Sequence, residues 1–171
     1  MHTWNRLSAP MSSQGWMSWI AFVVICFIAA GLGSVATASS VKTWYPQLLK
    51  PPRTPPSWVF GPVWTMLYLL MATAAWVVWR HHAEWDVRLA LALFFGQLAL
   101  NTAWSFLFFG ARRPGEALVE IVALLIAIAA TTIAFGRVSR TAFWMMVPYL
   151  CWVGYATYLN LGIWRLNRGA P

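Results

Sequence analysis

Five long apolar segments, separated by short charged or proline-rich connections, constrain what this chain can fold into more than any other feature of its sequence. They lie near residues 16–38, 58–79, 87–109, 115–135 and 142–164. Each has the length of about 20 residues that a helix needs to cross the hydrocarbon core of a bilayer. The segments are apolar all round and far too long for strands, which excludes a β-barrel. The sequence therefore predicts an all-α membrane protein, a bundle of five transmembrane helices.

The charged residues indicate the same environment. Only 9% of the 171 residues are charged and 60% are hydrophobic, whereas soluble domains carry about 25% charged residues. Twelve lysines and arginines outnumber four acidic residues and give a net charge of +8. They stand mainly in the connections, where they meet the anionic headgroups of the lipid bilayer. Because they are scattered and not gathered on one face, no nucleic acid is expected as a partner.

The distribution of charge also predicts a topology. The length suits one domain, residues 16–167, with a disordered N-terminal tail (1–15) and a C-terminal tail (168–171). With five crossings, five lysines and arginines fall on the side of the N-terminus, and seven fall on the side of the first loop and the C-terminus. The positive-inside rule therefore predicts a multi-pass integral membrane protein with its N-terminus outside and with its first loop and C-terminus in the cytoplasm.

The stretch WYPQLLKPPRTPPSWVFGPVW, residues 44–64, joins the first two apolar segments. Proline fixes φ and has no N–H, so PPRTPP must be an extended or turning loop. Large aromatic residues frame it, among them Trp44, Tyr45 and Trp58. We expect the Trp44–Trp58 loop to fold over the mouth of the bundle as a lid or as one wall of a pocket. The alternative is an aromatic anchor at the depth of the lipid headgroups.

Familiar catalytic motifs are absent from the sequence. It has no Walker loop, GxSxG or HExxH, and its three histidines lack the spacing of metal ligands, so neither conventional hydrolysis nor a metal site is expected. Polar residues inside the apolar segments are therefore the candidates. Asn101 and Trp104 are three residues apart on one helix face, where they can address a ligand or a neighbouring helix. Glu120 lies a turn inside the fourth segment, where an interfacial position is favoured over a catalytic one.

The fifth apolar segment carries a second candidate face. Trp152, Ala156 and Leu159 fall at i, i+4 and i+7 and so form one stripe along a helix. Alanine in this stripe permits the close approach of another backbone or of a flat ligand. Together with Trp64 and the face of Asn101, the stripe suits a flat aromatic molecule stacked between indoles.

Four motifs follow one another between about Gly31 and Asn167: WYxxLxKPPxTPPxWVFGPVWTxLY, GQLALNxAWSFLFFGAR, ALVEI and PYLxWxxYATYLN. In this order they resemble the translocator protein family, whose members are also called tryptophan-rich sensory proteins or peripheral-type benzodiazepine receptors. The resemblance implies a five-helix membrane bundle, often dimeric, whose long first loop caps a pocket. It also implies binding of porphyrins, haem-related tetrapyrroles, sterols and synthetic isoquinoline or benzodiazepine ligands.

The resemblance further implies a set of pocket residues. No cofactor is required, and porphyrin or haem is expected as a ligand. The chain departs from the family at Arg53, which replaces a tryptophan of the loop motif and, with Lys50, is a candidate contact for a propionate. Leu161 replaces the tyrosine of the animal sterol motif, so that motif is incomplete here. The ligand-binding residues carried over are Tyr45, Trp64, Tyr68, Asn101, Trp104, Trp152, Ala156 and Leu159.

Three functions are compatible with these residues. The favoured one is a membrane sensor, regulator or transporter that binds tetrapyrroles and has no catalytic residues. The second is a light-dependent porphyrin-degrading enzyme with Trp64 and Trp152 as redox-active indoles. The third is a structural membrane protein that acts through partners. Small residues that allow close helix packing, together with the resemblance, imply a homodimer. They are Ala29, Gly33, Gly96 and Ala99.

Overall fold

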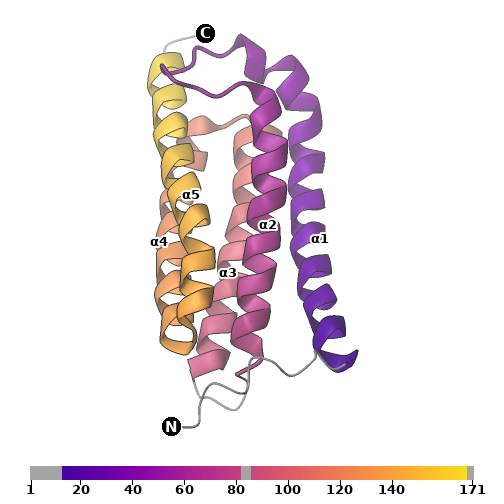
Figure 1. Cartoon of the computed structure of the whole chain (residues 1–171). Helices are drawn as coiled ribbons and strands as arrows, with labels where there is room; N and C mark the ends of the chain where they lie inside the picture. Colours follow the sequence, from indigo (N-terminus) through magenta and orange to yellow (C-terminus); the bar gives the residue numbers. More distant parts are fainter. Residues whose placement is uncertain (1–12, 82–85, 169–171) are drawn as a thin grey trace.

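The computed structural model describes residues 13–81 and 86–168 and shows a bundle of five long antiparallel helices (Figure 1). Around the bundle the neighbours follow the order α1, α2, α5, α4, α3, and α3 packs back on α1. The loop after α1, the turn before α4 and the end of α5 therefore lie together, at the top of Figure 1, and we call this the loop end. The helices are α1 (Ser13–Thr43), α2 (Ser57–Trp79), α3 (Asp86–Ser105), α4 (Pro114–Val138) and α5 (Arg140–Asn167).

Four of the five helices are long and apolar enough to cross a membrane. These are α1 from Gly15, α2, α3 together with its extension to Gly110, and α4. The predicted all-α class and the multi-pass membrane character are confirmed. The fifth helix has 28 residues but is not among the four, because tyrosines and asparagines along it lower its hydropathy. A fifth crossing therefore stays a prediction.

The first and last helices are longer than their apolar segments. The first begins at Ser13, within the predicted tail, and continues to Thr43; residues 1–12 of that tail lie outside the described residues. Two indoles tie α1 to α2 at the end opposite the loop. Trp19 Nε1 donates to Thr73 Oγ1 at 3.2 Å, and Trp76 Nε1 donates to the carbonyl oxygen of Gly15 at 3.0 Å. The free thiol of Cys26 is buried in the core between the helices.

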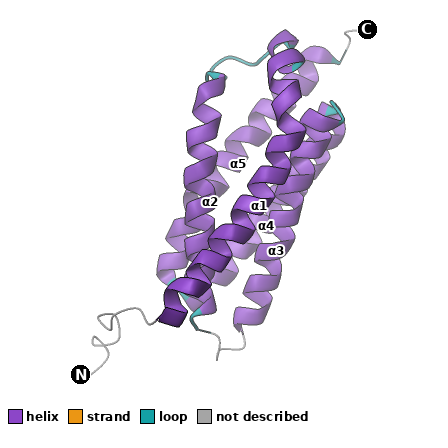
Figure 2. Ribbon diagram, turned by 90° about the vertical axis from the view of Figure 1, so that its right-hand side faces the viewer, coloured by secondary structure: helices purple, strands orange, loops and turns teal. Residues whose placement is uncertain are grey.

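The Trp44–Trp58 loop crosses from α1 to α5 before it returns to α2 (Figures 1 and 2). It contains one short 3₁₀ turn, η1 (Tyr45–Gln47), and is otherwise irregular up to the start of α2 at Ser57, as its prolines require. Two side chains of α5 hold it. Asn167 accepts from the backbone N–H of Leu49 at 3.1 Å and donates to its carbonyl oxygen at 3.0 Å. Tyr155 donates its hydroxyl to the carbonyl oxygen of Arg53 at 2.6 Å.

The third helix ends in a π-helical turn, η2 (Phe106–Gly110). The backbone N–H of Ala111 bonds the carbonyl oxygen of Phe106 at 2.7 Å, five residues back. Pro114 then opens α4, where a proline costs no hydrogen bond. The Arg113–Glu116 ion pair at 3.0 Å places a carboxylate in the first turn of that helix, as its dipole favours.

Candidate functional site

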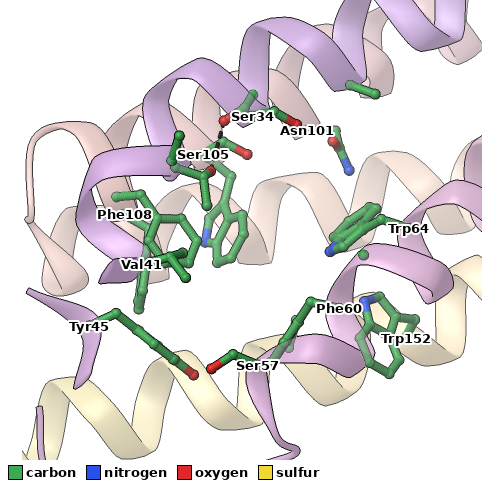
Figure 3. Close-up of a pocket in the computed structure, with 18 of the residues that line it drawn as sticks. Ser34, Val41, Tyr45, Ser57, Phe60, Trp64, Asn101, Ser105, Phe108 and Trp152 are labelled. Carbon is green, nitrogen blue, oxygen red and sulfur yellow. Dashed lines mark hydrogen bonds between the residues drawn. The ribbon is translucent and has the colours of Figure 1, made fainter. Parts of the chain in front are cut away.

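A cavity of about 530 Å³ lies within the loop-end half of the bundle (Figure 3). Its walls come from the C-terminal half of α1, the N-terminal half of α2, the end of α3 with η2, and the C-terminal half of α5, whereas α4 contributes no described residue. Most of the lining is aromatic or aliphatic. Pockets for small molecules are commonly about 300–1,000 Å³ and mostly apolar with a few polar groups. The cavity therefore has the size and chemistry of a ligand site.

The structure brings all eight pocket residues carried over from the sequence to the wall of this one cavity. Their role in binding stays a prediction. Lys50 and Arg53, the candidate propionate contacts, are not among the described lining residues, which include the cation Lys42 of α1. By element, the eight are Tyr45 of η1, Trp64 and Tyr68 of α2, Asn101 and Trp104 of α3, and Trp152, Ala156 and Leu159 of α5.

Aromatic rings from α2 and α5 form one wall of the cavity. Phe60 meets Trp152 edge to face with ring centroids 5.9 Å apart, and Figure 3 shows Trp64 close by. The Trp64 ring lies 5.7 Å from that of Tyr68 and 6.2 Å from that of Tyr149. The indole N–H of Trp152 is buried and has no hydrogen-bond partner within the described part of the chain. This wall thus offers ring faces and one unused donor.

A chain of hydrogen bonds that begins at the cavity wall joins three helices. The hydroxyl of Tyr68 donates to Asn101 Oδ1 at 2.7 Å, and Asn101 Nδ2 donates to the Tyr149 hydroxyl at 2.8 Å. Tyr149 in turn donates to Gln97 Oε1 at 2.9 Å. The sequence allows Asn101 to address either a ligand or a neighbouring helix, and the structure shows the hydrogen bonds to neighbouring helices. Since an amide has two donor hydrogens and two acceptor lone pairs, half of its capacity is still unused.

A second network fixes Trp104. Its indole N–H donates to Asn160 Oδ1 at 3.1 Å, and Asn160 Nδ2 donates to the carbonyl oxygen of Pro114 at 2.7 Å. The Trp104 ring stacks on Phe108 with centroids 5.2 Å apart and meets Phe109 edge to face at 5.9 Å. The ring is therefore held rigidly at the wall, with its polar edge already satisfied.

Tyr45 lines the cavity at the loop end. Its ring is buried and lies 5.7 Å from that of Phe109. The ammonium group of Lys50 sits 4.8 Å from its centroid and bonds the loop carbonyl oxygens of Pro46 and Leu48 at 3.3 and 3.4 Å. Burial, and then the nearby phenol of Tyr155, raise the pKa of Tyr45 above its ordinary value, so the group is neutral at physiological pH. The loop thus contributes an uncharged aromatic ring to the lining of the cavity.

Several lining residues escape the sequence reasoning. One group is a strip of α1 in which Ala30, Ser34, Thr37 and Val41 recur every three or four residues. The small residues around Gly33 are the sequence signal that could have indicated this strip. The aromatic rings of η2 gave no such signal, because their direction depends on the π-helical turn. Within residues 13–81 and 86–168, no group of three His, Cys, Asp or Glu side chains could hold a metal ion.

Comparisons with known proteins agree with this architecture. The profile of the TspO/MBR family matches residues 22–165. The chain is 44% identical to the tryptophan-rich protein TspO of Chlorobaculum tepidum over 144 residues, which are 84% of this chain and 91% of the relative. It is 39% identical to the translocator protein of Homo sapiens over 156 residues (90% and 92%) and 37% identical to the tryptophan-rich sensory protein of Cereibacter sphaeroides over 159 residues (93% and 97%).

Proposed function

This chain belongs to the TspO/MBR family, and from that premise we propose that it binds porphyrin or haem-related tetrapyrroles in the loop-end cavity, as a membrane sensor, regulator or transporter. The observation that carries the proposal is the convergence of eight candidate residues from four elements on one cavity of about 530 Å³. Relatives are named as translocator and sensory proteins, which suits a protein whose pocket binds without turnover. Isoquinoline or benzodiazepine-type ligands and sterols are further candidates for the same space.

The chemistry of the wall supports a flat, mostly apolar ligand. Trp64, Trp104 and Trp152 present ring faces, and stacked aromatic pairs are worth about 0.5–1.5 kcal/mol beyond the area they bury. Ala156, on the same stripe as Trp152, leaves room for a ring. The unused N–H of Trp152 suits a ligand acceptor, because a buried donor without a partner costs free energy. For the propionates, Lys42 lines the cavity, while Lys50 and Arg53 would act from the loop.

We also propose that α5 crosses the membrane and that the Trp44–Trp58 loop is a lid. The helix packs between α2 and α4, and its 28 residues extend about 42 Å at 1.5 Å per residue, more than the roughly 30 Å of a hydrocarbon core. Its bonds to Leu49 and Arg53 support a loop that closes the mouth. The distribution of basic residues supports a cytoplasmic loop end and an N-terminus outside.

Two copies of the chain are proposed to associate. Among the small residues considered from the sequence, Ala29 and Gly33 are buried within the bundle, whereas Gly96 and Ala99 are exposed on α3. Close approach of small residues is a common basis of helix association in lipid. The exposed pair therefore supports an interface through α3.

Titration of the purified protein with protoporphyrin in the dark, followed by absorbance and tryptophan fluorescence, tests the binding proposal. We expect saturable binding that is stable over time and weakened by substitution of Trp152. Absence of saturable binding would contradict the proposal and favour a structural protein that acts through partners.

Porphyrin photo-oxidation is the second candidate, because two oxidisable indoles, Trp64 and Trp152, line the same cavity. The same titration under light distinguishes it. Light-driven bleaching of bound porphyrin to a new product, abolished in Trp64→Phe, would establish the enzyme. Unchanged spectra under light would leave binding without turnover.

A further inference from the structure

A second hollow, of about 390 Å³, lies at the end of the bundle opposite the loop, where α4 turns into α5. We call it the α4–α5 groove. It has no residue in common with the loop-end cavity and plays no part in the function proposed above. Its lining combines two cations with apolar and aromatic side chains. The residues are Ile133, Gly136, Arg137, Arg140, Phe143 and Trp144.

The two arginines of the groove have no partner among the residues that the structure describes. Both are exposed, and neither has an ion pair, a hydrogen bond of its guanidinium group or an aromatic ring contact within residues 13–81 and 86–168. Three other arginines near the helix ends are engaged. Arg80 lies 5.0 Å from the ring centroid of Trp76, Arg168 lies 4.5 Å from that of Trp164, and Arg113 pairs with Glu116. Among the described residues, the groove therefore presents two unpaired positive charges in its lining.

The apolar part of the groove lies deeper along the helices than the charges. Ile133 stands one turn before Arg137 on α4, and Trp144 stands one turn after Arg140 on α5; both are more than half exposed, at 57% and 59%. The Phe143 ring, which meets Trp144 edge to face at 5.1 Å, packs where a side chain on Gly136 would come within 3.0 Å of it. Charge at the helix ends with apolar surface beneath is the arrangement of a phospholipid, whose headgroup lies above its chains.

We propose that the α4–α5 groove binds an anionic phospholipid, with the guanidinium groups of Arg137 and Arg140 on its phosphate and Ile133 and Trp144 along its acyl chain. Arginine forms short, charge-assisted and often bidentate hydrogen bonds with phosphate oxygens. Tryptophan favours the level of the headgroups. The end of α4, a helix apolar enough to span, places the groove at that level.

Native mass spectrometry of the detergent-solubilised full chain, titrated with phosphatidylglycerol and separately with phosphatidylcholine, tests this site. We expect a first phosphatidylglycerol to bind more tightly than phosphatidylcholine. The double variant Arg137→Gln/Arg140→Gln should weaken that first event about 30-fold, or about 2 kcal/mol at 1.4 kcal/mol for each factor of ten, because it removes both charge-assisted hydrogen-bond donors to the phosphate.

A matched control removes two arginines from the other end of α5. Arg165→Gln/Arg168→Gln should leave the first phosphatidylglycerol unchanged, and circular dichroism should show that both double variants keep their helices. Equal weakening in the two double variants would overturn the proposal, because it would show a general effect of net charge. Equal affinity for the two lipids, or displacement by soluble glycerol phosphate at the lipid's own concentration, would also overturn it.

Discussion

At the scale of single residues, the stripe of α5 that faces the cavity gives the most direct test of ligand binding. Trp152→Ala should weaken porphyrin binding by about 1–3 kcal/mol, the usual cost of losing an aromatic stacking partner. Ala156→Thr, which adds a branched side chain and a hydroxyl to the wall, should also weaken flat ligands while the bundle stays folded. Dissociation constants from the dark titration measure both effects.

Trp58→Ala is the control for this pair. Trp58 is 75% exposed and does not line the cavity, although it lies at the same end of the bundle. The Trp58→Ala variant should bind porphyrin as the parent protein does. Unchanged affinity in Trp152→Ala and Ala156→Thr, with normal circular dichroism, would place the porphyrin site elsewhere.

Tyr149 is the residue on which the polar network depends most. Tyr149→Phe removes the hydroxyl between Asn101 and Gln97 and leaves both amides without that partner. Hydrogen bonds between membrane helices are worth about 0.6–2 kcal/mol, so the thermal midpoint in detergent should fall. Tyr158→Phe, on an exposed face of the same helix, should leave it unchanged. Equal midpoints for the parent and Tyr149→Phe would show that the network does not stabilise the bundle.

Residue-level reasoning from the sequence reached the cavity wall but not the groups behind it. Asn101 and Trp104 could be found because a polar amide and an indole three residues apart stand out in an apolar helix. Tyr149 and Gln97 could not be assigned, since their bond depends on how α3 and α5 rotate against each other. The sequence favours an interfacial position for Glu120, yet its carboxylate oxygens are buried and have no partner among the described residues. Depth along a helix does not determine which way a side chain faces.

At the scale of elements, hydropathy located each helix but not its ends. The first apolar segment stops at Ala38, whereas α1 continues through Ser40 and Lys42 to Thr43. A helix can continue through polar residues where their side chains form hydrogen bonds. Here the hydroxyl of Ser40 donates to the carbonyl oxygen of Phe109 at 2.6 Å. The irregular loop could be foreseen from its prolines. The attachment of the loop to α5 could not be foreseen, because it depends on how the loop and α5 come together in the folded protein.

The attachment of the loop to α5 should control ligand release. Asn167→Ala/Tyr155→Phe removes three hydrogen bonds to the loop backbone. We expect the dissociation rate of porphyrin, measured by stopped-flow fluorescence, to rise more than the association rate falls. Thr43→Ala, which removes a hydroxyl bonded only to its own helix at the same end, is the control. An unchanged dissociation rate in the double variant would argue against a lid.

At the scale of the whole molecule, one side of the bundle is free to meet a second copy. Apart from its chain neighbours and the nearby backbone of its own helix, a Cβ added at Gly96 on α3 or at Gly31 on α1 would meet no atom of the described residues within 4 Å. Gly96→Leu should therefore fold normally but separate the proposed dimer. Gly31→Leu should also fold normally and should leave the dimer intact. Subunit counts in native-membrane nanodiscs measure this. A parent protein that is only monomeric there would contradict the association itself.

The π-helical turn of η2 makes the cavity sensitive to chain length as well as to composition. In a regular α-helix successive side chains are about 100° apart, so the residues four and five positions after Trp104 would point in clearly different directions. Here both Phe108 and Phe109 touch the Trp104 ring and line the cavity. Deleting one residue between 106 and 110 would restore the regular register and turn one ring away, a change that porphyrin titration would detect. An alignment that tolerates a gap at this turn would therefore compare different pockets, even where every other residue is the same.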